Sequence, residues 1–197
     1  VEVNPNTVRA TALAIAPYLG AATAGSGTNW GDTTFTQSLT TVAQVIALGR
    51  DTFLPNILTR IADHKTIADA STIGFNGGSL SLIAYEAGAN MVASVNQADA
   101  PLNTLLNSAI QDQGMFQLYR DYLSGCRTEG MTLMAHYSAF RALSNANKYG
   151  LLQTMTQDLS SAWRYRAWRG LGYGSSPSSR KATAVAAYRK LVAMRRR

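Results

Sequence analysis

The chain has 197 residues, of which 46% are hydrophobic and 15% are charged, a composition typical of one globular domain and not of a disordered chain. Its charge is divided unevenly. Residues 159–197 carry ten basic and no acidic side chains, which leaves net charges of −3 before this segment and +10 within it. The positive charge therefore belongs to a tail, which argues against a protein whose folded body serves mainly to bind nucleic acid.

The contents of the chain exclude several further classes of protein. The single cysteine, Cys126, excludes an internal disulfide framework, and two distant histidines provide no spaced set of metal ligands. No apolar run approaches the roughly 20 residues that a membrane span requires, and the first residues do not resemble a secretory signal. We therefore expect a soluble protein without a metal or cofactor. The start at Val1 suggests processing or a fragment of a longer protein, so the cellular location is left open, and secretion would require a signal upstream.

Three short apolar runs predict strands, at residues 12–19, 80–86 and 131–137. The first contains Pro17, which suits the end of a strand because proline cannot donate to the ladder. Each run leads into a polar loop. The carboxyl end of each predicted strand is thus followed by residues that can contact a ligand.

Helical spacing of apolar residues fills the intervals between these runs. Residues 35–70 predict two helices with a break at 49–52, and residues 101–130 predict a second helical block. Strands separated by such long crossovers pair in parallel, which indicates an α/β fold. In such folds ligands bind beyond the carboxyl ends of the strands.

The predicted strand ends carry aromatic, amide and carboxylate groups. Aromatic faces stack on sugar rings, amides bind hydroxyls, and a carboxylate can act as nucleophile at an anomeric carbon. Each residue also has a plainer interpretation: a glutamate there is often simply solvated, and tyrosine or histidine often belongs to the core. The candidate sugar-binding residues are Tyr18, Trp30, Asp32, Tyr85, Asn90, His136 and Tyr137, with Glu86 as the candidate catalytic residue.

Several motifs, in order along the chain, resemble the C-terminal half of a bacterial family of glycoside-hydrolase-like proteins with a clan A type TIM barrel, often labelled cellulose-binding. The resemblance spans about residues 10–160. The motifs that carry it are Ala14–Gly20 (AIAPYLG), Ile83–Gly88 (IAYEAG), Met115–Tyr119 (MFQLY), Ala135–Tyr137 (AHY) and Lys148–Gly150 (KYG).

The resemblance implies roles for three of these residues. Glu86 would be the nucleophile on the seventh strand of the barrel, Tyr18 would orient it from the sixth strand, and His136 would lie on the eighth. The family's acid/base carboxylate belongs to an earlier strand that this chain does not contain. The chain also departs from the family pattern, with Ala87 in place of a glycine. The resemblance therefore implies either a retaining glycoside hydrolase that lacks its acid/base half here or a degenerate relative that binds an oligo- or polysaccharide.

Length points to a partial barrel, since a complete one takes about 250 residues. We assign residues 1–169 to the C-terminal part of a partial (β/α)8 barrel and residues 170–197 to a basic linker and short helical tail. An open partial sheet would expose apolar edges. The missing half of the barrel, or another chain, is therefore an expected partner.

The basic segment supports an alternative function, that of a structural or interaction protein which docks on nucleic acid or another anionic surface. Two tryptophans are interleaved with arginines there, so the same residues also fit a last helix that packs its tryptophans and exposes its arginines. The candidate residues for an anionic partner are Arg164, Arg166, Arg169, Arg195, Arg196 and Arg197.

Overall fold

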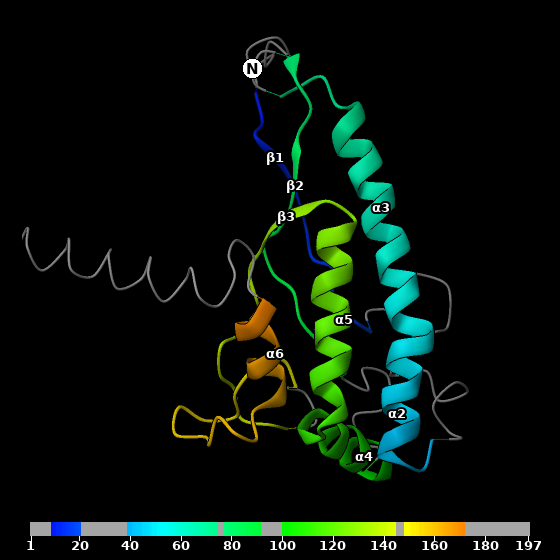
Figure 1. Ribbon diagram of the computed structural model, residues 1–197, viewed down its shortest axis with the longest axis vertical. Helices are drawn as coiled ribbons and strands as arrows, with labels where there is room; N and C mark the ends of the chain where they lie inside the picture. Colours follow the sequence, from blue (N-terminus) through cyan, green and yellow to red (C-terminus); the bar gives the residue numbers. More distant parts are fainter. Residues whose placement is uncertain (1–8, 21–38, 75–76, 92–99, 145–147, 172–197) are drawn as a thin grey trace, which may run out of the picture.

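The computed structural model describes residues 9–20, 39–74, 77–91, 100–144 and 148–171. In these segments the chain alternates between short strands and long helical crossovers (Figure 1). The strands are β1 (Ala12–Ile15), β2 (Ser81–Ala84) and β3 (Met131–Met134), and the helices are α2 (Val42–Leu48), α3 (Leu54–Ala70), α4 (Ala100–Gln111), α5 (Gly114–Thr128) and α6 (Trp163–Leu171).

The strands form one parallel sheet in the order β1-β2-β3, which confirms the predicted α/β class. Leu13 of β1 pairs with Leu82 of β2, and Ala84 of β2 pairs with Met134 of β3. The strands are shorter than the apolar runs that predicted them. Beyond β1 the regular ladder stops before Pro17, which has no N–H to donate.

The predicted break between the first two helices is wrong. Residues Gly49–Phe53 form a π-helical turn that joins α2 to α3, and the N–H of Leu54 donates to the carbonyl of Gly49. Gly49 has ordinary helical dihedral angles, but a Cβ there would lie 2.8 Å from Leu118 of α5. Glycine therefore lets the Leu118 side chain pack closely at this position and does not break the chain.

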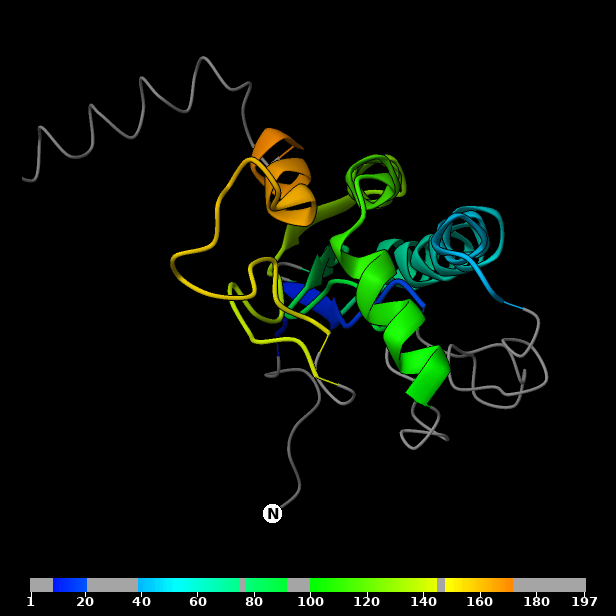
Figure 2. The ribbon, with the colours of Figure 1, turned by 90° about the horizontal axis from the view of Figure 1, so that it is seen from below.

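The helices cover one face of the sheet. Figure 2 shows α3, α5 and α6 on the same side of it. Leu82, Ala84 and Met131 point into the core on that side, against the buried face of α5. On the opposite face Leu133 is 55% exposed, and no helix of the described segments covers it. The sheet thus has one packed and one open face.

Candidate functional site

Backbone hydrogen bonds bring the three strand ends together. The N–H of Leu19 donates to the carbonyl of Gly88 at 2.8 Å, and the N–H of Asn90 donates to Leu19 at 2.8 Å. The N–H of Tyr137 donates to the carbonyl of Ala87 at 2.9 Å. Segments that are far apart in the sequence therefore present neighbouring side chains at this edge of the sheet.

Three tyrosines form a cluster at these strand ends. Their ring centroids lie 6.1 Å apart for Tyr18 and Tyr137, 5.9 Å for Tyr18 and Tyr149, and 5.3 Å for Tyr137 and Tyr149. Each pair meets edge to face, the geometry that aromatic quadrupoles favour. Tyr137 is 45% exposed, so the tyrosine cluster (Tyr18, Tyr137, Tyr149) is open to a ligand.

Glu86 lies beside this cluster. Burial raises the pKa of Tyr18 well above its usual range. The negative charge of the nearby Glu86 and the hydrogen bond between Tyr18 and Glu86 raise this pKa further. Tyr18 therefore stays protonated and donates to Glu86. Among the described residues, Glu86 is the only acidic residue within two residues of the carboxyl end of a strand.

Tyr149, which reaches the cluster from the segment after β3, was not among the predicted site residues. Its hydroxyl donates to Asn90 Oδ1 at 3.1 Å. Burial raises its pKa, with Tyr137 and Glu86 adding to the effect and Arg141 opposing it. Its neighbour Lys148 is buried and donates to Asn103 Oδ1 at 3.0 Å, and burial lowers the pKa of Lys148 to about 8. This buried contact fixes the segment that carries Tyr149.

His136 lies behind the cluster, where it supports the backbone. Its Nδ1 is 3.0 Å from the Ser138 carbonyl, its Nε2 is 3.4 Å from the Tyr119 hydroxyl, and its ring meets Trp168 at a centroid distance of 4.9 Å. A Cβ on Gly88, whose φ is +137°, would lie 2.7 Å from His136 Nε2. Burial, and then the charge of Arg164, lower the pKa of His136 to about 4, so the ring is neutral at physiological pH.

Two fully buried tyrosines of α5 hydrogen-bond to the backbone of the loops that follow β1 and β2. The Tyr119 hydroxyl accepts the N–H of Ala89 at 2.7 Å, and the Tyr122 hydroxyl donates to the carbonyl of Pro17 at 2.5 Å. Sequence reasoning placed both only on an apolar helix face. One sequence signal could have indicated this role: both residues are tyrosines on a buried helix face that aliphatic side chains could fill.

Tyr85 does not join the tyrosine cluster. It is 60% exposed and instead lines a cavity between β1 and α3. Two further predicted sugar-binding residues, Trp30 and Asp32, lie outside the described residues, so the structure does not test them.

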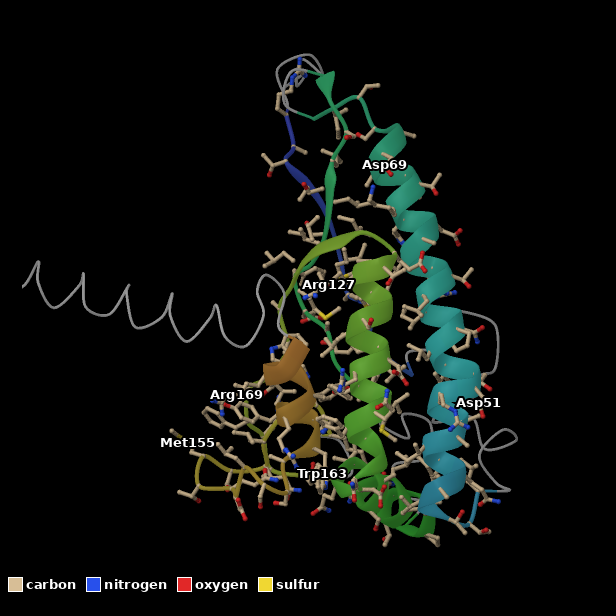
Figure 3. The ribbon with its side chains drawn as sticks, in the orientation of Figure 1. Asp51, Asp69, Arg127, Met155, Trp163 and Arg169 are labelled. Atoms are coloured by element: carbon tan, nitrogen blue, oxygen red, sulfur yellow. The ribbon has the colours of Figure 1, made fainter. Side chains whose placement is uncertain are left out.

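The predicted anion-binding arginines of α6 differ in their surroundings. Arg164 is 3% exposed and donates to the carbonyl of Lys148 at 2.8 Å, so it belongs to the interior and does not face a partner. Arg166 is exposed, and its guanidinium carbon lies 4.7 Å from the centroid of the Trp163 ring. Arg169 lies on the side of α6 that faces away from α5 (Figure 3). The other candidates, Arg195, Arg196 and Arg197, lie outside the described residues.

The described part of the chain has neither a membrane-spanning helix nor a cluster of metal ligands. None of its helices is both long enough and apolar enough to cross a membrane. Its His, Cys, Asp and Glu side chains also form no group of three that could hold a metal ion.

Comparison of the chain with protein-family models, curated proteins and solved structures gave no match. The resemblance to glycoside-hydrolase-like barrels therefore stays a prediction.

Proposed function

We propose that the strand ends form a carbohydrate-binding site with Glu86 at its centre. The observation that carries this proposal is the open tyrosine cluster directly beside the Glu86 carboxylate. Rings offer apolar faces for a sugar ring, while the carboxylate and the Asn90 amide offer hydrogen bonds to hydroxyls. The site also lies at the carboxyl edge of a parallel sheet, where α/β proteins commonly bind ligands.

We further propose that this sheet is part of a (β/α)8 barrel. Two features support this: the strands are all parallel, and the helices cover only one face. In a barrel the opposite face, with Leu133, would point into the packed interior. The remaining strands would come from outside the described residues.

Hydrolysis would need a second carboxyl group. A retaining glycosidase places its nucleophile and its acid/base about 5–5.5 Å apart. Glu86 suits the role of nucleophile, because Tyr18 donates to it and leaves the remaining lone pairs for a substrate. The second carboxyl group would come with the missing strands, so this chain by itself is expected to bind sugar without hydrolysing it.

The test is calorimetric binding of β-linked oligosaccharides to this chain, with Glu86→Gln and the matched variant Glu129→Gln beside it. Glu129 follows α5, at the opposite edge of the sheet. We expect Glu86→Gln to weaken binding about tenfold, since a charge-assisted hydrogen bond is lost, and Glu129→Gln to leave it unchanged. Absence of binding to any oligosaccharide, or equal loss in both variants, would contradict the proposal.

A longer chain, or a complex with a second chain, that supplies the remaining strands would test catalysis. Hydrolysis that Glu86→Gln abolishes and Glu129→Gln preserves would establish Glu86 as the nucleophile. Unchanged turnover in Glu86→Gln would remove it from the mechanism.

A further inference from the structure

A cavity of about 300 Å³ lies between the C-terminal half of β1 and the middle of α3. This volume is at the lower end of the range of small-molecule sites. Its walls combine apolar side chains and three polar ones. The lining residues are Ala14, Ile15, Ala16, Pro17, Ile57, Arg60, Ile61, His64 and Tyr85.

Arg60 is the only lining residue that carries a permanent charge. In the described part of the chain its guanidinium makes no ion pair and no hydrogen bond, whereas Arg50 on the same continuous helix is paired with Asp51. Arg60 is half-buried, and this limits the water available to it. A half-buried guanidinium next to apolar walls is complementary to an anion.

His64 and Tyr85 add directed polar atoms to the same cavity. His64 Nδ1 lies 2.7 Å from the carbonyl of Arg60, one helical turn earlier, so that nitrogen carries the proton and donates along the helix. In a neutral ring Nε2 is then an acceptor, which can bind a donor group of a ligand but not its carboxylate. The Tyr85 hydroxyl can donate as well, since no hydrogen bond within the described residues occupies it.

We propose that this cavity binds a small organic carboxylate with an apolar body. Arg60 would bind the carboxylate through its two parallel N–H groups, while Ile57, Ile61 and the alanines of β1 contact the hydrocarbon part. The Tyr85 hydroxyl would supply a further donor at the mouth. This inference does not depend on the carbohydrate proposal, since the cavity shares no lining residue with the tyrosine cluster or Glu86.

The test uses hydrocinnamate as the probe and hydrocinnamamide, which has the same body without the charge, as its neutral counterpart. Binding to the full chain is followed by amide chemical shifts in two-dimensional NMR spectra. We expect hydrocinnamate at millimolar concentration to shift signals of α3 and of residues 14–17, and the amide to bind about tenfold more weakly because it lacks the ionic contact. Phenyl phosphate, tested in parallel, shows whether the site prefers the planar carboxylate, and we expect it to bind more weakly.

Variants separate recognition from non-specific attraction. Arg60→Gln should weaken hydrocinnamate binding about tenfold, and Arg60→Lys should weaken it less because it keeps the charge but not the planar fork. Arg120→Gln removes an exposed arginine of α5 outside the cavity and should leave binding unchanged. The proposal is overturned by absence of shifts in α3, by equal binding of acid and amide, or by equal losses in Arg60→Gln and Arg120→Gln.

Discussion

Apart from Tyr85, which lines the separate cavity, five of the described tyrosines lie around the strand ends, and they divide into an outer and an inner group. Tyr18, Tyr137 and Tyr149 of the outer group contact each other and polar side chains at the surface. Tyr119 and Tyr122 of the inner group are fully buried and hydrogen-bond to backbone groups of the loops that follow β1 and β2.

This difference separates residues that can meet a ligand from residues that fix the loops carrying them. A buried backbone N–H left without an acceptor has a high cost in free energy, whereas a surface hydroxyl that loses its partner binds water instead. We therefore expect changes in the inner group to affect the free energy of unfolding, and changes in the outer group to affect binding.

The largest expected effect comes from Tyr119→Leu. The substitution leaves a cavity in the core and removes the acceptor of the buried Ala89 N–H, so we expect a loss of about 4 kcal/mol in the free energy of unfolding. Urea denaturation measures it. Tyr137→Leu, the matched change in the outer group, should cost less than about 1 kcal/mol. Similar losses in the two variants would refute the division into two groups.

A second prediction concerns His136, which lies behind the tyrosine cluster and contacts Tyr119 of the inner group. Its pKa in the folded protein is about 4, below the ordinary value of 6.5, so the unfolded chain takes up a proton first as the pH falls. Stability is therefore fully present above about pH 6.5 and is lost as the pH falls toward 4. Between about pH 6.5 and 5, where carboxylates titrate little, the loss should reach about 2 kcal/mol.

The measurement is urea denaturation across that pH range, with His136→Gln as the comparison. The slope of stability against pH should flatten in this variant, whatever the variant's stability at neutral pH. An unchanged slope in His136→Gln would show that His136 is not held neutral by its surroundings.

The parallel sheet could be predicted from the sequence because local patterns determine it. Continuous apolar runs mark strands, and helical spacing between them requires crossovers and parallel pairing. The junction at Gly49 could not be predicted, because glycine and a following proline read as a break. Only the packing of Leu118 against this glycine, from a helix far away in the sequence, reveals that it allows close approach.

The candidate site was predictable in part. Glu86 and Tyr18 lie within three residues of the ends of β2 and β1, and the structure places them together. Arg164 was predicted at the surface, because a run of alternating arginines and aromatics does not show which arginine has a buried acceptor. Tyr85 and Glu86 are adjacent in the sequence, yet Tyr85 lines a separate cavity. Neighbours in an extended segment point to opposite sides, and the sequence alone does not identify which side carries the site.

The smallest expected effect on stability comes from removing a hydroxyl of the outer group. Tyr149→Phe deletes the hydrogen bond to Asn90 Oδ1, and because both side chains are only half-buried, water can replace it. We expect a loss of about 0.5 kcal/mol, against about 2 kcal/mol for Tyr119→Phe, where the Ala89 N–H stays buried without its acceptor.

The same pair of variants separates stability from binding. Oligosaccharide affinity, measured by calorimetry, should fall in Tyr149→Phe because Asn90 is no longer oriented by the phenol. Tyr119→Phe should keep its affinity at temperatures where it is fully folded, since its hydroxyl contacts only groups behind the site. The reverse result, with affinity lost only in Tyr119→Phe, would mean that the inner group determines recognition by setting the positions of the loops, and that the outer rings contribute contact area alone.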